Sequence, residues 1–211
     1  MKIRRIKPRH IPRTLDAVAH YGASVLADKQ ADKQDELHRT SYCILATAVG
    51  VACCRALGID ARPMSVEAHA MNADMAQWIE DGQPDPRPDT AWGVGLLNER
   101  PPGFPGRHGG WNGHLVVEVI GRGFLDLNCG PLGRPQHQMW MPSAMYLPKI
   151  LTHEFDDCCL ELGNMNEQPG STYIMYRRAQ GDGAENWRDS PDWLHRHEYA
   201  DTYADSICAQ I

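Results

Sequence analysis

The stretch SYCILATAVGVACCRALGIDARPMSV, residues 41–66, decides the fold. Its apolar residues form an almost continuous face over residues 43–57, a pattern that predicts one buried helix. Thr40 or Ser41 is suited to be the N-cap of this helix, and Gly58 fits just beyond its C-terminus. The helix is therefore expected to lie at the centre of the fold.

Further elements are predicted on both sides of this helix. An amphipathic helix is expected at about residues 11–37, although Gly22 falls on its apolar face. Residues from about 81 to 113 are rich in Pro, Gly and Asp and are expected to form a long irregular loop, which in a compact domain usually has a functional role. Strands are predicted at residues 61–70, 114–120, 124–128 and 171–178, and a helix over residues 191–211 with Ser190 as its N-cap.

This order of elements predicts an α+β fold, in which an antiparallel sheet packs against the central helix. A chain of 211 residues is long enough for one sizeable core and too short for two ordinary domains. We therefore expect a single domain over residues 1–211, with the N-terminal helix before the core and a C-terminal extension at about residues 166–211.

The composition narrows the class of partner. The formal net charge of −6, from 21 basic and 27 acidic residues, argues against nucleic acid or an anionic membrane as the main partner. No stretch is apolar enough to span a bilayer and the N-terminus lacks the apolar segment of a secretory signal, so a cytoplasmic location is expected. The seven cysteines, which include two adjacent pairs, are expected to be reduced thiols.

Cys43 is the first candidate for a catalytic group. A cysteine becomes a useful nucleophile when its thiol is ionised near neutral pH, and both a helix N-terminus and a nearby imidazolium favour the thiolate. The helix dipole contributes only about 0.3–1 kcal/mol at an exposed site, so a histidine partner is still required. In the competing interpretation, Cys43 is simply a small buried apolar residue.

His114 is the candidate partner of this thiol, and Asp126 is the candidate that orients the imidazole. His114 opens a strongly apolar strand. Asp126 interrupts the apolar run FLDL at residues 124–127, where a buried carboxylate is costly unless it has a partner. Orienting a histidine is one such use of a buried carboxylate.

The geometry of the predicted hairpin decides whether His114 and Asp126 can meet. If residues 120–122 form the turn, Asp126 is the diagonal neighbour of His114 on the same face and within side-chain reach. If the turn is at residues 121–123, Asn128 takes that place. A two-residue turn puts His114 on the opposite face from both. Asp126 is the first choice and Asn128 the alternative.

These segments resemble the core of transglutaminase-like cysteine proteins, a superfamily related to papain. The resemblance rests on SYCILATAVGVACCRALGIDARPMSV and, after a gap, WNGHLVVEVIGRGFLDLN, and it covers roughly residues 40–134. In that superfamily a Cys opens the central helix, a His starts one strand and an Asp lies on the next. The interval from His to Asp is tighter here than in many members, and no side chain stands out as an oxyanion donor, so the backbone N–H of Cys43 is expected to serve.

The resemblance implies a cysteine-dependent hydrolase or acyl transferase that attacks an amide or ester carbonyl through Cys43, His114 and Asp126 and passes through an acyl-enzyme. The superfamily includes peptidases, amidases and transglutaminase-type acyl transferases, so a protein or peptide is the expected substrate and no cofactor is expected. It also includes inactive relatives, so a catalytically silent protein-binding module of the same fold is the alternative function.

A structural zinc protein is a third hypothesis. The chain has no paired C-x2-C or H-x3-H spacing of the kind that marks a zinc site. The potential zinc ligands in this chain have no regular spacing, and residues in such an irregular set are more often ordinary surface and core residues. The residues concerned are His153, Cys158, Cys159, His195 and His197.

Overall fold

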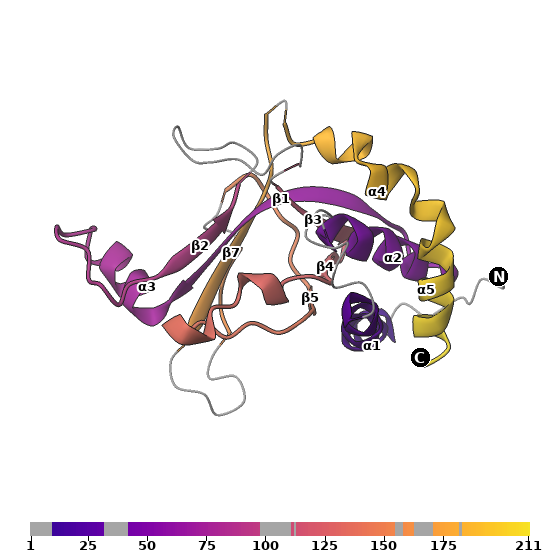
Figure 1. Cartoon of the computed structure of the whole chain (residues 1–211), viewed down its shortest axis with the longest axis horizontal. Coiled ribbons are helices and arrows are strands. Elements are labelled where there is room, and N and C mark those ends of the chain that lie inside the picture. The colour runs from indigo at the N-terminus through magenta and orange to yellow at the C-terminus, as the bar shows by residue number, and fades with distance from the viewer. Residues whose placement is uncertain are drawn as a thin grey trace.

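Figure 1 shows the computed structural model of the chain, which describes residues 10–31, 42–97, 111, 113–154, 158–162, 171–181 and 183–211. A curled antiparallel sheet packs against several helices, so the fold belongs to the α+β class, as predicted. None of the described helices combines the length and the apolar composition needed to span a bilayer.

Helix α2 (Tyr42–Ala56) coincides with the predicted buried helix and lies at the centre of the molecule. It ends where expected, because Gly58 adopts a φ of +69° just beyond it. The backbone N–H of Ile59 then donates to the Cys54 carbonyl at 2.8 Å, which satisfies one of the last carbonyls of the helix. The predicted N-cap at residues 40–41 lies outside the described residues.

The sheet has seven strands within the described residues, and every pairing is antiparallel. The strands are β1 (Ala61–Asn72), β2 (Gly93–Leu96), β3 (His114–Val119), β4 (Gly123–Asp126), β5 (Met145–Leu147), β6 (Cys159–Glu161) and β7 (Thr172–Arg178). Their order across the sheet is β5-β4-β3-β1-β7-β6, and β2 pairs with β1. The long, curved strand β1 therefore links β3 on one side to β7 on the other (Figure 1).

The β3–β4 hairpin adopts the first of the three registers considered from the sequence. Val119 pairs with Gly123, so residues 120–122 form the turn. This register puts Asp126 on the same face of the hairpin as His114 and offset by one diagonal step. The relation between these two residues is thus set by a short local turn.

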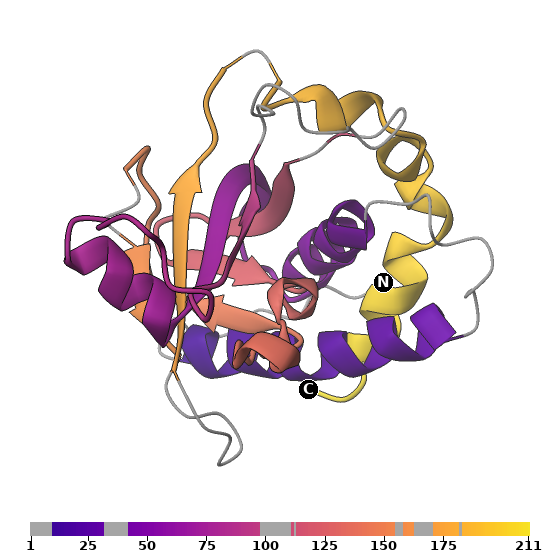
Figure 2. The same cartoon turned by 60° about the vertical axis from the view of Figure 1, so that its left-hand side comes forward.

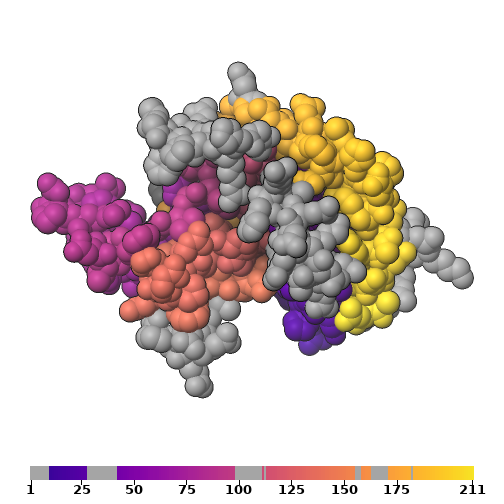
Figure 3. Space-filling view, viewed as in Figure 1, coloured from indigo at the N-terminus to yellow at the C-terminus, as the bar shows by residue number. Residues whose placement is uncertain are grey.

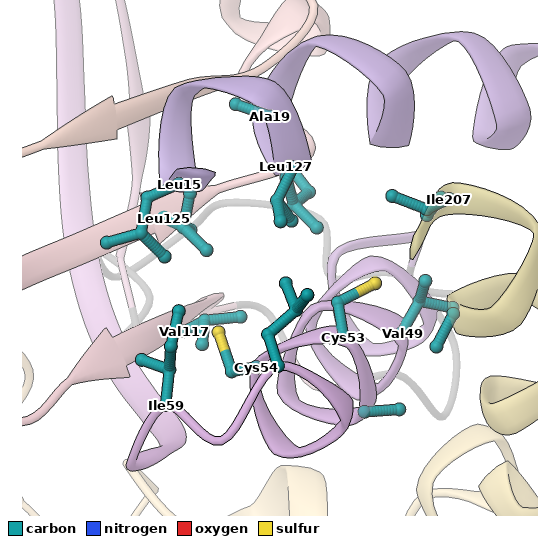
Figure 4. Packing of buried hydrophobic residues seen from close by; sticks show 14 of the residues in the cluster. Leu15, Ala19, Val49, Cys53, Cys54, Ile59, Val117, Leu125, Leu127 and Ile207 are labelled. Atoms are coloured by element: carbon teal, nitrogen blue, oxygen red, sulfur yellow. The ribbon is translucent and has the colours of Figure 1, made fainter. Parts of the chain in front are cut away.

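Helices α1 (Ile11–Ala31) and α5 (Ala200–Cys208) pack with α2 over one face of the sheet (Figures 1 and 2). Figure 4 shows the core between them. Its side chains include Leu15 and Ala19 of α1, Val49 of α2, Ile207 of α5, and Val117, Leu125 and Leu127 of the hairpin and its continuation. The predicted N-terminal helix is confirmed over the described residues, and residues 32–37 of the prediction lie outside them.

The close approach of α2 to the hairpin depends on Gly50. A Cβ at this position would lie 2.6 Å from Val117 Cγ2 and 2.9 Å from Leu127 Cδ1. Both distances are too short for real carbon contacts, so an alanine here would require the neighbours to move. The helix that carries Cys43 is therefore seated against β3 and the residues that follow β4.

The opposite face of the sheet has its own core, so β3, β4 and the middle of β1 are buried on both faces. The side chains that form it include Val66 and Ala68 of β1, Val116 of β3, Phe124 of β4, Ile174 and Tyr176 of β7, and Leu132, Met139 and Leu151 from connecting segments.

The sequence did not predict strands β2, β5 and β6 or the helix at Ala73–Glu80. Helix α3 (Ala73–Glu80) follows β1 directly, and the Asn72 side chain caps it by accepting from the N–H of Met75 at 3.0 Å. Strand β2 lies inside the segment 81–113 that was expected to be irregular, so that expectation was wrong for its four residues. The sequence GVGL has two glycines in four residues, which weaken a strand, and it becomes a strand through its pairing with β1.

The C-terminal helix predicted over residues 191–211 is divided. Ser190 caps α4 (Pro191–Leu194) as expected, but a 3-10 turn (Arg196–Glu198) follows before α5 begins. Tyr199, with φ of −133°, leaves the helical conformation between the turn and α5. This break lets the segment bend along one side of the molecule, whereas α3 projects from the other (Figure 3).

Candidate active site

Cys43 is the second residue of α2 and lies in its first helical turn. Its side chain is only 6% exposed and belongs to a small cluster with Ile44, Leu115 and Trp187. The backbone N–H groups of a first helical turn lack intrahelical partners and carry the positive end of the dipole, which favours a thiolate. The structure thus places the predicted nucleophile at a helix N-terminus and shields it from water.

Thr47 fixes the start of α2 against the strand that carries His114. Its hydroxyl donates to the backbone carbonyl of Leu115 at 2.8 Å, in a buried position. Thr47 lies about one helical turn after Cys43, and Leu115 directly follows His114. This hydrogen bond therefore holds the turn that bears the thiol beside the first residue of β3.

The structure brings His114 and Asp126 into direct contact. The distance from His114 Nε2 to Asp126 Oδ2 is 2.7 Å, and the two side chains are 2% and 0% exposed. Asn128, the alternative third residue, contributes its backbone N–H instead, which donates to Asp126 Oδ1 at 2.9 Å. The side chain that contacts the imidazole is therefore that of Asp126.

Tyr176 is a further member of this network that sequence reasoning missed. Its hydroxyl donates to Asp126 Oδ2 at 2.7 Å, and its side chain is fully buried. Asp126 thus accepts from the His114 ring, the Tyr176 hydroxyl and the Asn128 backbone, and such a set of donors stabilises a buried carboxylate. Nothing in the strand pattern STYIMYRR distinguishes this tyrosine from its neighbours.

The pKa values of the buried pair move in opposite directions. Burial raises the pKa of Asp126, but the charge of His114 and the three hydrogen bonds outweigh it, so that its pKa lies below the usual value. Burial also lowers the pKa of His114, but the Asp126 carboxylate and hydrogen bonds to Asp126 and to the Cys43 thiol raise it to about 10. The arrangement therefore favours imidazolium and carboxylate at neutral pH.

The Cys43 thiol is the second partner of the imidazole. A hydrogen bond and a charge interaction with Cys43 both contribute to the raised pKa of His114. Because Asp126 engages Nε2, Nδ1 is the ring nitrogen left to face the sulfur. The structure therefore connects the three predicted residues in the order Cys43, His114, Asp126.

Other cysteines lie in different surroundings. Burial raises the pKa of the thiols of Cys54, Cys129 and Cys158, and therefore disfavours their thiolates. Cys159 is exposed. All seven cysteines lie in the described residues, and none is in a disulfide. Cys43 differs from these four in having both an imidazole partner and a helix N-terminus.

The residues considered for a zinc site do not come together. Cys158 is buried in the core on the far face of the sheet from α2. His195 and His197 lie in the C-terminal segment, with ring centroids 6.5 Å apart. Across the described ranges, no three His, Cys, Asp or Glu side chains are grouped so as to hold a metal ion.

A pocket of about 250 Å³ opens near the start of α2. Helix α1, the first turns of α2 and the segment after β4 enclose it, and its lining includes Leu26, Tyr42, Ala46, Leu127, Asn128 and Ser143. Tyr42 directly precedes the candidate nucleophile, and Asn128 donates its backbone N–H to Asp126. The described residues that line the pocket include no charged side chain, so it suits an uncharged group.

Comparisons of the chain with protein-family models, with curated protein sequences and with solved structures found no significant match in any of the three.

Proposed function

We propose that this protein is a cysteine-dependent hydrolase or acyl transferase that uses Cys43, His114 and Asp126 as a catalytic triad. The observation that carries the proposal is the buried His114–Asp126 pair, in which interaction with the Cys43 thiol also contributes to the raised pKa of His114. An ion pair buried this deeply is weak evidence for stability, because desolvation offsets much of its attraction. Its position beside a thiol at a helix N-terminus supports a catalytic use.

The proposed first step forms an acyl-enzyme. The Cys43 thiolate attacks the carbonyl carbon of an amide or ester, and the backbone N–H of Cys43 stabilises the oxyanion that develops. As the bond to the leaving group breaks, the His114 imidazolium gives its proton to the departing amine or alkoxide. Asp126 holds the imidazole ring and stabilises its charged form until then.

The second step releases the acyl group. Neutral His114 removes a proton from water or from an acceptor amine, which then attacks the thioester carbon. The C–S bond breaks, the Cys43 thiolate is restored, and the proton remains on His114. With water as acceptor the reaction is hydrolysis, and with an amine it is acyl transfer.

We also infer a transglutaminase-like, papain-related core within the α+β class. Three features support this inference: Cys43 lies at the start of the central helix, His114 is the first residue of β3, and Asp126 is the last residue of β4. The expected substrate is a protein or peptide. The uncharged pocket near the start of α2 fits a peptide group or an uncharged side chain better than a charged one.

The rate of thiol alkylation as a function of pH tests this function. Iodoacetamide is applied to the wild type and to His114→Ala, and each modified cysteine is located by mass spectrometry. The exposed Cys159 is the internal reference in both proteins. Cys43 is expected to react well below the pKa of about 8.5 of a free thiol, and to lose this reactivity in His114→Ala.

Either result directs the next experiment. If Cys43 is alkylated at a lower pH than a free thiol, and if this reactivity depends on His114, amide and ester libraries are screened. Cys43→Ala is the inactive control. If Cys43 reacts no faster than Cys159, or stays silent in both proteins, the catalytic proposal fails. The alternative, a protein-binding module without catalysis, then takes its place.

A further inference from the structure

Two donors share one oxygen of Asp126. The His114 ring and the Tyr176 hydroxyl both lie 2.7 Å from Oδ2, whereas Oδ1 accepts the backbone N–H of Asn128. The Tyr176 ring is fixed as well, because it packs edge-on against Phe124 with ring centroids 5.0 Å apart. Neither its ring nor its hydroxyl is exposed to solvent.

The contact between Tyr176 and Asp126 depends on the curl of the sheet. Strands β7 and β4 are separated by β1 and β3, so in a flat sheet they would lie about 14 Å apart. A tyrosine side chain does not span that distance. The sheet is curled (Figure 1), and the small Ala68, which pairs with Tyr176 on β1, leaves room for the ring to cross.

We propose that Tyr176 is a positioning residue of the triad, whose hydroxyl fixes the Asp126 carboxylate in the orientation that His114 requires. This role rests on the proposed function of His114 and Asp126. The hydroxyl also takes up part of the hydrogen-bonding capacity of Oδ2, which leaves that oxygen a weaker base. The proton shared between His114 and Asp126 is thereby kept on the imidazole, as the catalytic cycle requires.

The titratable groups around this network stay neutral in the acidic range where Asp126 titrates. Burial raises the pKa of Tyr176 well above its usual value. The Cys129 thiol, near Asp126, and the Cys158 thiol, near Tyr176, also have pKa values raised by burial. A change in the acidic part of the Cys43 alkylation profile can therefore be assigned to the group formed by Cys43, His114 and Asp126.

Tyr176→Phe tests the proposal, because it removes the hydroxyl and keeps the ring. Tyr173→Phe is the matched control, since Tyr173 lies on the opposite face of the same strand and its hydroxyl bonds the Glu161 side chain. The first measurement is the proton NMR resonance of the hydrogen on His114 Nε2. The second is the pH profile of Cys43 alkylation.

The two measurements should change together in Tyr176→Phe. Asp126 Oδ2 becomes a stronger acceptor for His114, so the Nε2 proton resonance is expected to move downfield. Asp126 also loses a donor that lowers its pKa, so the acid limb of the alkylation profile is expected to move to higher pH by roughly one unit. Tyr173→Phe is expected to match the wild type in both measurements.

An unchanged resonance and an unchanged profile in a folded Tyr176→Phe protein would show that Tyr176 is only a packing residue. If Tyr176→Phe does not fold, 3,5-difluorotyrosine placed at position 176 gives the decisive measurement. Its stronger hydroxyl donor should move the resonance upfield, and no movement overturns the proposal.

The resonance of the His114 Nε2 proton also tests the role of Tyr176 independently of the proposed function. It reports the bond between His114 and Asp126 and does not require a reactive thiol. If Cys43 shows no enhanced reactivity in the wild type, the proposed function fails, yet the resonance still decides whether Tyr176 positions Asp126.

Discussion

His114 Nε2 lies 2.7 Å from Asp126 Oδ2, and neither side chain is more than 2% exposed. Replacing a buried ion pair by well-packed apolar residues is often neutral or even stabilising, so such a pair is not explained by stability alone. A catalytic role would explain the pair, because the Cys43 thiol at the start of α2 also interacts with the imidazole and contributes to its raised pKa.

Asp126→Asn is expected to abolish the special reactivity of Cys43. The substitution keeps the shape of the side chain and removes its charge, so burial becomes the dominant influence and the pKa of His114 falls. Alkylation of Cys43 at neutral pH should slow by at least about tenfold, and turnover of any substrate by about 10³–10⁴-fold. An alkylation rate equal to that of the wild type would show that Asp126 is not a member of the triad.

Asn128→Ala is the matched control for that substitution and is expected to change little. Asn128 contributes its backbone N–H to Asp126 Oδ1, and alanine retains this group. The free energy of unfolding should change by no more than about 0.5 kcal/mol, and Cys43 should keep its alkylation profile. A loss of reactivity as large as in Asp126→Asn would instead identify Asn128 as the third member.

The sequence could predict that the three candidate residues lie near one another because their relative positions depend on local chain geometry. An apolar helical pattern that starts at Cys43 places the thiol in the first turn of a helix. A three-residue turn at 120–122 then fixes Asp126 relative to His114, whichever way the rest of the sheet is built. The choice between Asp126 and Asn128 needed the register of that turn, which three possible turns left open.

Tyr176 and β2 were missed because neither depends on local pattern. Tyr176 reaches Asp126 across two intervening strands, through a curvature that no short stretch of sequence encodes. Strand β2 has two glycines in four residues and becomes a strand by pairing with β1. The division of the C-terminal segment into α4 and α5 likewise follows from packing, which brings Ala204 and Ile207 into the core beside α1 and α2.

Thr47→Val is expected to weaken both the fold and the site. Valine has nearly the shape of threonine but cannot donate to the Leu115 carbonyl, so the free energy of unfolding should fall by about 1–2 kcal/mol. Cys43 should also react more slowly, because its helical turn is no longer tied to β3. Thr47→Ser keeps the hydroxyl and should retain the reactivity of Cys43. Equal loss of reactivity in both variants, measured by alkylation, would show that the hydrogen bond does not position the thiol.

Alanine should have opposite effects at two glycines on core-facing helix surfaces. At Gly50 the added Cβ would lie 2.6 Å from Val117 Cγ2, so Gly50→Ala is expected to lower the free energy of unfolding by about 1–3 kcal/mol. At Gly22 the nearest atom, Leu127 Cδ2, is 3.5 Å away, an ordinary contact. Gly22→Ala is therefore expected to stabilise α1 by about 0.5–1 kcal/mol. Chemical denaturation checks both, and a Gly50→Ala variant as stable as the wild type or more stable would contradict the close seating of α2.

The pair of His114 and Asp126 should also make stability depend on pH in a defined direction. The pKa of His114 rises on folding from 6.5 to about 10, so its stabilisation is complete below 6.5 and is lost as pH rises through about 10. The pKa of Asp126 falls on folding from 3.8, so its stabilisation is present above 3.8 and is lost as the solution becomes more acidic. The contribution of the pair is therefore greatest between 3.8 and 6.5.

His114→Gln isolates the alkaline part of this dependence. Glutamine can donate to Asp126 but does not titrate, and groups such as His69 that titrate in both proteins cancel in the difference between them. The free energy of unfolding should be higher in the wild type than in the variant. This difference should be larger at a pH just below 6.5 than at a pH above about 10. Urea denaturation across this range measures the difference. A difference that stays constant with pH would mean that the His114 pKa is not raised on folding, and the imidazolium needed to hold a Cys43 thiolate would lose its support.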